Sequence, residues 1–462
     1  MTERQTGLSP QICILPGGEQ RLLADIGTID PTSLASYRQH GGYAGLERAI
    51  EKLGAEGTVD EIGAAGLRGR GGGGYPTADK WLAARAIEGE RKVVANLIGA
   101  DPTALGDRAL AEGNPHALLE GVLVAAFAIG ASEAIIAVRR DWTVAIERLR
   151  AAVAEAEAAH LAGYLVMGTD FSCVVSVFEG AAALVAGEET ALLAALAGDR
   201  GMPVIRPPFP TERGLRGAPT TVQNGETLVS VAWIARHGAR KFRAVGSKDA
   251  PGTKLVSIHG RVAQPGLAEV ALGTPLSAVV ALAAGGTGST KAVFVGGPGG
   301  GALGSAEFET PYDYEPLHAA GAGIGLGQFL VTDTDTCMVD TARFFLDYSA
   351  REACGKAVPC RIGTKRLVET LDRILAATVC QFRIVGVPYN AEHNRTRTKI
   401  EWHAVADMKP LMTIEFGCQP PRLNRGHPYG RSFAVLSNHP SIAIQTPIGN
   451  DRWQAVHMND VV

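Results

Sequence analysis

The chain has 462 residues, of which 46% are hydrophobic and 20% are charged, and its formal net charge is −3 at pH 7. This length allows two or more domains with sizeable cores, and this composition is ordinary for a soluble globular protein. The nearly balanced charge gives no electrostatic basis for binding nucleic acid or an anionic membrane surface.

The sequence also bears on location. The N-terminus lacks the basic region and apolar run of a secretory signal, so we expect a cytoplasmic protein that reaches the inner face of the membrane only through partner subunits. The most apolar segment, 117–138, is interrupted by Glu120 and Glu133 and predicts a buried helix and strand instead of a membrane span. The seven scattered cysteines are typical of reduced thiols in the cytosol.

The first half of the chain alternates between helical and strand patterns. Residues 1–35 are rich in turns and are expected to form an N-terminal extension. Strands alternating with helices then predict an α/β domain over residues 36–247. The predicted elements of this domain are a helix over 37–53, a strand over 92–97, a helix over 115–128, a strand over 134–138 and a helix over 142–161.

The most informative segment is GLRGRGGGGYPTADKW, residues 66–81. Its glycines can turn backbone N–H groups toward one point, and a helix beginning after Pro76 would add free N–H donors at the positive end of its dipole. Such a loop suits a phosphate, with Lys80 as a candidate partner. The spacing matches neither the Walker nor the Rossmann glycine motif. The alternative is a flexible glycine loop without a ligand.

The composition changes near residue 248. A strand over 254–259, a turn-rich stretch over 260–269, a short helix over 274–284 and a strand over 291–295 predict a small module over residues 248–310.

The pattern becomes helical over residues 325–379, with Met338, Ala342 and Phe345 on one face. Residues 380–462 carry five of the eleven histidines and no sustained periodicity. We interpret this tail as atypical, either a disordered segment or a non-native end produced by a change of reading frame.

Several motifs in a fixed order resemble the flavin-carrying NADH-oxidising subunit of respiratory complex I. The same family includes the β subunits of NAD-dependent formate dehydrogenases and of NAD-reducing hydrogenases. The resemblance covers about residues 24–375 and is carried by the glycine loop, GEETALLAALAGDRGMPVIRPPFP, TTVQNGETL, GTKLVSIHGRVAQPGLAEVALGTPL and CMVDTARFFLDYSAREACGKAVPCRIG. It implies a Rossmann-like FMN/NADH domain, a small β-grasp (ubiquitin-like, SLBB-like) domain over 248–310 and a C-terminal helical bundle related to the iron–sulfur domain.

The same resemblance implies a set of cofactor-binding residues. The positions expected around FMN and the nicotinamide are Gly69, Arg70, Gly71, Gly72, Gly74, Lys80, Asn96, Asp101, Gly187, Glu188, Glu189, Thr221, Gln223 and Asn224. Tyr75 and Phe209 match the aromatic positions near the adenine, and Arg206 stands where the family usually carries Lys. Glu188 and Glu189 are the expected catalytic residues, next to a hydride transfer that depends mainly on stacking and orientation.

Three of these positions have an alternative interpretation from the residues alone. Glu188 and Glu189 also suit the first turn of a helix, where carboxylates stabilise the dipole without any ligand. Phe209, between two prolines, could equally pack into a core.

The sequence departs from the family at the flavin site. Where the family has an acidic cluster after the first core strand, this chain has Ile98 and Gly99, and only Asp101 remains. Leu184 replaces a Tyr that the family places in the NADH site. Polar groups of this kind contribute about 1–3 kcal/mol each, so FMN binding is better supported than NADH oxidation.

The iron–sulfur motif is incomplete. A [4Fe–4S] cluster in this family takes four thiolates, three of them from C-x-x-C-x-x-C. Cys354 and Cys360 are present, but Ala357 occupies the middle position and the fourth Cys is missing near residue 400. Either other ligands, such as tail histidines, complete the site or the cluster is absent, and we expect absence.

These observations predict an NADH dehydrogenase of the diaphorase type. It would exchange hydride between NAD(H) and FMN and pass electrons to the iron–sulfur and catalytic subunits of a redox complex. The alternative is a degenerate homologue that acts as a structural or assembly subunit. A third possibility treats residues 248–300 as a free-standing ligand-binding module.

Overall fold

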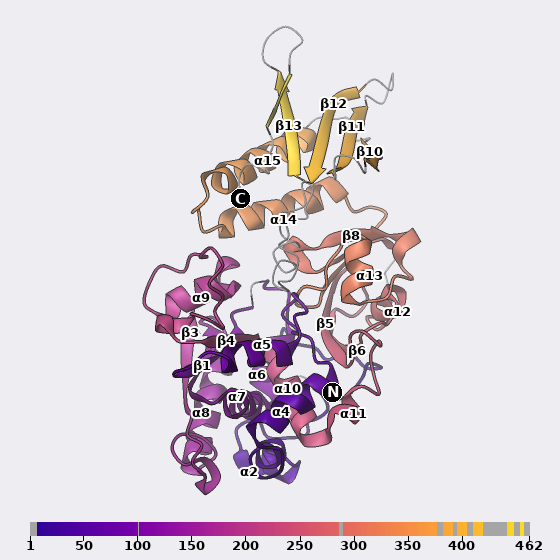
Figure 1. Cartoon of the computed structure of the whole chain (residues 1–462). Coiled ribbons are helices and arrows are strands. Elements are labelled where there is room, and N and C mark those ends of the chain that lie inside the picture. The colour runs from indigo at the N-terminus through magenta and orange to yellow at the C-terminus, as the bar shows by residue number, and fades with distance from the viewer. Residues whose placement is uncertain are drawn as a thin grey trace. The chain divides into compact units, whose positions relative to one another are not determined.

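The computed structural model describes residues 7–99, 101–285 and 290–376, and five later segments, 382–390, 395–403, 410–418, 441–447 and 453–456. The chain divides into two compact units, residues 1–335 and 336–462, which are described separately (Figure 1).

A four-stranded parallel sheet forms the centre of the first half of the chain. Its strands are β1 (Arg91–Leu97), β2 (Ala131–Arg139), β3 (Val174–Gly180) and β4 (Thr220–Asn224), in the order β3-β2-β1-β4. The middle of β1 reads VVA and is fully buried, as expected for a parallel strand covered on both faces. Because β2 and β4 lie on opposite sides of β1, the order in which strands are added to the sheet changes direction at β1. Proteins of the α/β class commonly bind ligands at such a switch point, at the carboxyl ends of the strands.

Helices surround this sheet (Figure 1). They are α2 (Leu34–Gln39), α3 (Ala44–Arg48), α4 (Gly54–Ala65), α5 (Thr77–Arg85), α6 (Gly106–Gly113), α7 (Pro115–Ile129), α8 (Thr143–Ala158), α9 (Glu189–Leu196), α10 (Gly225–His237) and α11 (Ala239–Phe242). Shorter turns are the π-helical η1 (Ala49–Leu53) and the 3₁₀ turns η2 (Val166–Gly168), η3 (Val185–Gly187), η4 (Leu215–Gly217), η5 (Gly297–Gly299) and η6 (Ser305–Glu307). The predicted strands over 92–97 and 134–138 and the predicted helices over 115–128 and 142–161 are confirmed within a few residues. The single helix predicted over 37–53 is wrong, because α2 ends at Gln39 and a turn with Tyr43 at a φ of 63° separates it from α3.

Helix α7 is apolar on nearly all sides because it lies in the middle of the core. Asn114 caps its N-terminus by accepting a hydrogen bond from the Ala117 N–H at 3.2 Å. A Cβ atom on Gly121 would lie only 1.9 Å from the Leu228 carbonyl oxygen of α10. Glycine therefore allows α7 and α10 to pack closer than any other residue would.

The described part of the N-terminal segment belongs to this core, which corrects the expectation of an extension over residues 1–35. Leu22, Leu23 and Ile26 are buried in the main hydrophobic cluster. The buried Glu269 carboxylate accepts hydrogen bonds from the Leu22 and Leu23 backbone N–H groups at 2.9 and 3.1 Å. Burial raises the pKa of Glu269, and these hydrogen bonds oppose that rise.

A second, mixed sheet follows in the same unit. Its strands are β5 (Thr253–Gly260), β6 (Gly266–Ala271), β7 (Thr290–Val295), β8 (Gly301–Gly304) and β9 (Gln328–Asp333), in the order β6-β5-β9-β7-β8, with helices α12 (Leu276–Ala281) and α13 (Tyr314–Ala319) beside them.

Three expectations for this region are wrong. The stretch 260–269, predicted as turns, contains most of β6, which pairs antiparallel with β5. The central strand β9 lies beyond residue 310, so the predicted end of the module is too early. For the same reason the helical region cannot begin at residue 325. The sequence pattern missed β9 because QFLVTD is short and lies next to a glycine-rich stretch.

The second unit contains the helices α14 (Met338–Glu352) and α15 (Val358–Ala376). An antiparallel sheet follows, made of β10 (Phe382–Asn390), β11 (Arg395–His403), β12 (Pro410–Cys418), β13 (Ser441–Pro447) and β14 (Trp453–Val456) in chain order. These segments are strands although the sequence shows no sustained periodicity there, and the rest of the tail lies outside the described residues. In the part of the chain that the structure describes, no helix combines the length and apolar character needed to span a membrane.

Candidate functional site

The glycine loop is a tight turn that leads into a helix, as predicted. The Gly69 N–H donates to the Tyr75 carbonyl at 2.9 Å, which closes the loop, and α5 begins at Thr77, directly after Pro76. Gly72 and Gly74 have φ angles of 107° and 60°, a region that L-residues with side chains rarely adopt.

The loop approaches its neighbours too closely for side chains. A Cβ atom on Gly71 would lie 3.2 Å from the Cβ of Asn224, and one on Gly72 would lie 3.2 Å from Gly325. A Cβ on Gly74 would lie 2.6 Å from the ring of Tyr314, whose hydroxyl donates to the Gly69 carbonyl at 2.9 Å. The loop is therefore fixed against the end of β4, the start of α13 and the segment that precedes β9, and the interpretation of a flexible linker is not supported.

Two asparagines stand side by side where the central strands end. Asn96 and Asn224 are register partners at the carboxyl ends of β1 and β4. The Asn96 side-chain amide donates to the Gly187 carbonyl at 2.9 Å. The Gln223 side-chain oxygen accepts from the Trp81 indole N–H at 2.9 Å. Four predicted positions from three distant segments are thus brought to one edge of the sheet.

A cluster of four charged side chains connects α5, α9 and the segment after α9. The Lys80 ammonium donates to Glu189 at 3.0 Å and to the Val222 carbonyl of β4 at 2.8 Å. The Arg206 guanidinium donates to Glu189 at 2.5 Å and to Glu188 at 3.3 Å. Two positive and two negative groups therefore neutralise one another in a half-buried position.

Glu188 also has the helix-capping role considered from sequence. Its carboxylate accepts hydrogen bonds from the Thr190 and Ala191 backbone N–H groups at 2.9 Å each, at the start of α9. Glu189 makes no such contact in the described hydrogen bonds and pairs instead with the two cations. The two neighbouring carboxylates therefore differ: Glu188 mainly shapes the helix, and Glu189 holds the charged cluster together.

Arg70 is fully buried, although it carries a charge. Its backbone N–H donates to the Thr227 hydroxyl at 2.8 Å, and its guanidinium donates to the Arg68 and Pro251 carbonyls at 3.1 and 2.6 Å. Its Nε atom is buried without a hydrogen-bond partner among the described residues, as are the hydroxyls of Thr77 and Thr221. Buried polar groups without partners are rare in folded proteins, and such atoms indicate a missing ligand or water.

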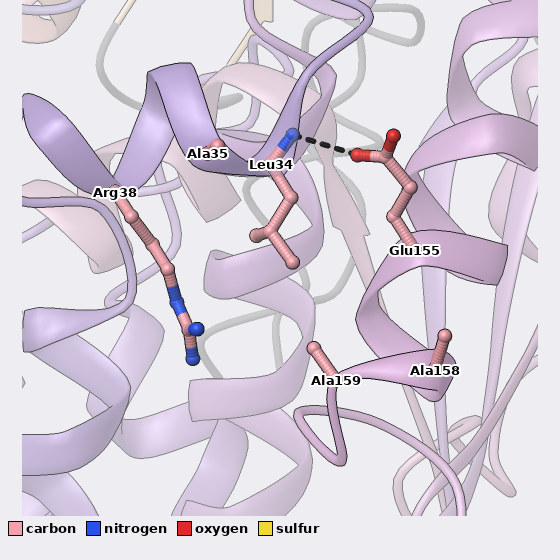
Figure 2. Close-up of a pocket in the computed structure, with 6 residues that line it drawn as sticks. All are labelled: Leu34, Ala35, Arg38, Glu155, Ala158 and Ala159. Carbon is pink, nitrogen blue, oxygen red and sulfur yellow. Dashed lines mark hydrogen bonds between the residues drawn. The ribbon is translucent and has the colours of Figure 1, made fainter.

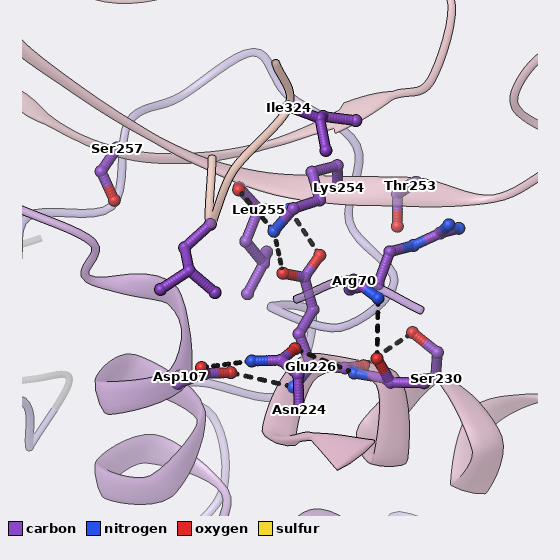
Figure 3. Close-up of polar contacts among 12 residues, drawn as sticks. Arg70, Asp107, Asn224, Glu226, Ser230, Thr253, Lys254, Leu255, Ser257 and Ile324 are labelled. Atoms are coloured by element: carbon purple, nitrogen blue, oxygen red, sulfur yellow. Dashed lines mark hydrogen bonds and ion pairs between the residues drawn. The ribbon is translucent and has the colours of Figure 1, made fainter. Parts of the chain in front are cut away.

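Asn224 belongs to a second polar network, shown in Figure 3, that sequence reasoning did not find. The Asn224 amide donates to Asp107 at 2.5 Å, and Asp107 also accepts the Glu226 backbone N–H at 2.9 Å. Glu226 forms an ion pair with Lys254 of β5 and accepts the Leu255 N–H at 2.8 Å. Burial, followed by the nearby Glu226 charge, raises the pKa of Asp107 to about 7. The sequence offered one indication of this buried network: the charged residue Lys254 stands directly before the apolar run LVSI, in a strand that is otherwise apolar.

The departures from the family have a structural consequence. Ile98 is fully buried in a small apolar cluster with Val94, Leu192 and Leu193. Gly99 has a φ of 55°, and a Cβ there would lie 2.7 Å from the Trp142 ring. The positions expected to carry carboxylates are thus occupied by packing residues.

The remaining predicted positions differ in their surroundings. Asp101 is buried and accepts from the Thr103 N–H and hydroxyl at 2.7 and 2.6 Å, so its carboxylate is engaged in a local turn. Tyr75, Phe209 and Leu184 are half-buried. Phe209 is not part of the hydrophobic clusters of the described residues, which argues against the core-packing alternative.

A separate pocket, shown in Figure 2, lies between α2 and α8. It has a volume of about 420 Å³ and is lined by Leu34, Ala35, Arg38, Glu155, Ala158 and Ala159. None of these residues belongs to the glycine loop or to the strand ends, so the pocket and the candidate site are distinct.

The residues present fit a phosphate-bearing flavin better than they fit an iron–sulfur cluster. The glycine loop, the N-terminus of α5 and the unpartnered Thr77, Thr221 and Arg70 atoms provide free donors around one sheet edge. In contrast, Cys354 and Cys360 are the only cysteines of the predicted motif, and no group of three or more metal-binding side chains gathers among the described residues. Two thiolates do not supply the four ligands of a [4Fe–4S] cluster.

Known protein families match two regions of the chain, the one with the glycine loop and the one with the cysteine motif. The family model of the Nuo51 FMN-binding domain matches residues 62–233. The model of the NADH-ubiquinone oxidoreductase-F iron–sulfur binding region matches residues 340–382, so this region is similar to that iron–sulfur binding region.

Individual relatives agree with these matches. The NADP-reducing hydrogenase subunit HndC of Solidesulfovibrio fructosivorans is 41% identical over 352 residues, which cover 75% of this chain and 71% of the relative. An F-type subunit of the NADH-quinone oxidoreductase of Rhizobium meliloti is 38% identical over 365 residues, covering 78% of this chain and 86% of the relative. The crystal structure of an NAD⁺-reducing [NiFe]-hydrogenase in the H₂-reduced state matches with a TM-score of 0.70 and 34% identity, covering 79% of this chain and 59% of that chain.

Proposed function

This chain belongs to the family of NADH-oxidising, FMN-binding F-type subunits of NADH-quinone oxidoreductase and related hydrogenases, and we propose that it is the diaphorase subunit of a multisubunit redox complex. It exchanges hydride between NAD(H) and FMN, and electrons then pass to iron–sulfur and catalytic partner subunits. FMN, when bound, supplies the chemistry that accepts a hydride and releases single electrons.

The observation that carries this proposal is the position of the glycine loop. Gly71 lies close to Asn224, because an added Cβ would come within 3.2 Å of the Asn224 Cβ, and the loop thereby meets the paired Asn96 and Asn224 at the edge where parallel sheets bind ligands. We propose that the loop, the N-terminus of α5 and Thr221 hold the phosphate and ribityl chain. Asn96 and Asn224 orient the polar edge of the flavin.

The nicotinamide nucleotide is proposed to enter beside the charged cluster. Glu189 is held by Lys80 and Arg206 in a half-buried position, which fixes its carboxylate for a polar contact with the nucleotide. Tyr75 and Phe209 are half-buried and can stack on an adenine. Glu188, which caps α9, orients this segment and is not expected to act as an acid or base.

The finer description of the architecture and location is part of the same proposal. We interpret the mixed sheet β6-β5-β9-β7-β8 as the β-grasp domain and the pair α14 and α15 as the remnant of a cluster-binding bundle. A cytoplasmic location agrees with the free thiols of Cys13, Cys173, Cys337 and Cys360.

A second candidate function is a structural or assembly subunit without turnover. It is favoured by Ile98, which packs in an apolar cluster where the family carries a carboxylate, and by the incomplete cysteine motif. In that case the fold would be retained for contacts with partner subunits.

A visible absorption spectrum, recorded before and after anaerobic addition of NADH, separates these functions. Flavin bands that bleach with NADH support the diaphorase. Flavin that stays oxidised supports a subunit that binds the cofactor without turnover, and a purified chain that takes up no FMN overturns the proposal. The variant Gly71→Ala is the control for the site, because its Cβ would lie 3.2 Å from the Asn224 Cβ and should weaken FMN uptake.

A further inference from the structure

The buried network around the start of α10 connects the second sheet to the flavin site. Asn224 directly precedes α10, and Glu226 lies in the first turn of this helix (Figure 3). Asp107 lies in the first turn of α6, and Lys254 lies at the start of β5. Asp107, Glu226 and Lys254 are all buried. None of the three was a predicted site residue.

The geometry around Asp107 leaves no freedom for the Asn224 amide. One carboxylate oxygen of Asp107 accepts the Asn224 Nδ2–H at 2.5 Å, and the other accepts the Glu226 N–H at 2.9 Å. The Asn224 oxygen accepts the Thr227 N–H at 3.4 Å. A Cβ on Gly225 would lie 3.0 Å from the Asp107 Oδ1, so glycine is what lets the carboxylate reach this turn.

We propose that Asp107 is a positioning residue for the flavin site. By binding one of the two side-chain N–H groups of Asn224, it fixes the rotation of the amide and therefore the direction of the second N–H, which is available to the cofactor. This inference rests on the FMN-binding function proposed above. Asp107 acts through Asn224 and does not itself contact the cofactor. The Lys254 and Glu226 ion pair holds the turn that carries the second hydrogen bond to Asp107.

The substitution Asp107→Asn tests this role with little change of shape. The two oxygens of Asp107 accept one hydrogen bond each, from the Asn224 amide and from the Glu226 N–H. An asparagine at this position has a single acceptor oxygen, so one of the two donors loses its partner. We expect about tenfold weaker FMN binding, measured by quenching of FMN fluorescence, which is the loss expected for one hydrogen bond to a charged acceptor. The matched control is Glu120→Gln, a fully buried carboxylate that binds Tyr37 and Tyr43 elsewhere in the core and should leave FMN affinity unchanged.

A double-mutant cycle distinguishes positioning from general destabilisation. If Asp107 acts through Asn224, then Asp107→Asn has no further effect on FMN affinity once Asn224→Ala is present. Losses that multiply in the double variant would overturn the inference, and so would Asp107→Asn binding FMN as tightly as the wild type. A wild-type chain that binds no FMN would overturn the proposed function and this inference with it.

A pH profile of the wild-type chain gives a test that does not require the Asp107 variant to fold. A protonated Asp107 loses an acceptor, so as the pH drops through about 7 the FMN affinity should fall more in the wild type than in Asn224→Ala. The FMN phosphate titrates equally in both proteins, so only the difference between the two profiles counts. The charged groups that face Asp107 are Glu226 of α10 and Lys254 of β5. Identical profiles in both proteins would contradict the inference.

Discussion

Replacing Lys254 with Met should destabilise the first unit strongly. The side chains of Lys254 and Glu226 are only 1% and 3% exposed, so water cannot solvate the carboxylate that the variant leaves behind. Glu226 keeps the Leu255 N–H, at 2.8 Å, as a donor. Breaking a buried ion pair by removing one partner costs about 3–5 kcal/mol, and we expect a loss of this size in the free energy of unfolding.

The assay is urea denaturation followed by tryptophan fluorescence. The double variant Lys254→Met with Glu226→Gln should recover most of the loss, because a neutral amide can still accept the Leu255 N–H and no charge stays buried. The matched control is Arg150→Met, whose ion pair with Glu179 is 55% and 44% exposed and should cost less than about 1 kcal/mol. A loss below about 1 kcal/mol for Lys254→Met, or no recovery in the double variant, would refute the reasoning.

Three further predictions concern packing, pH and thiol reactivity. Gly121→Ala should lower the melting temperature by many degrees, because its Cβ would lie 1.9 Å from a backbone oxygen. The control Gly57→Ala, whose Cβ would lie 3.5 Å from its nearest neighbour, should be neutral or slightly stabilising. Equal melting temperatures of the two variants would contradict this prediction. The pKa of Asp107 rises from 3.8 to about 7 on folding, so the free energy of unfolding should fall by about 4 kcal/mol as the pH rises between these values. In Asp107→Asn this pH dependence should vanish. Urea denaturation at several pH values would disprove the prediction if both proteins showed the same pH dependence. Burial raises the pKa of Cys173 to about 12, so a thiol reagent at pH 8 should modify the exposed Cys13 quickly and Cys173 only after unfolding, as peptide mass mapping would reveal.

The candidate site was predictable from sequence where its chemistry is local. The glycine loop and the helix after Pro76 follow from residues that are neighbours in the chain, and the structure confirms both. That Asn96 and Asn224 belong to one site was implied only by the family resemblance, because their strands are 128 residues apart in the chain. Which role Glu188 plays was left open by the sequence, since a helix cap and a ligand contact use the same residue type at the same position.

The rest depends on contacts between distant residues that no local pattern encodes. Asp107 meets Asn224 across 117 positions, and the run GDRALAEG reads as an ordinary amphipathic helix start. The end of the second sheet was missed because β6, β7 and β8, with short helices and turns, lie between β5 and its partner β9 in the chain. In physical terms, periodicity reports which face of an element is buried but not which element covers it.

The position of β9 between β5 and β7 also matters for how the chain is made. Ser257 of β5 pairs with Gln328 of β9, so roughly 70 residues must be added before β5 meets its parallel neighbour. At about 5–20 residues per second, the ribosome needs about 4–14 s for this stretch. During that interval β6 covers one edge of β5 while the other edge has no strand beside it. Nascent or truncated chains that end before Gln328 are therefore expected to expose this edge and to aggregate through it.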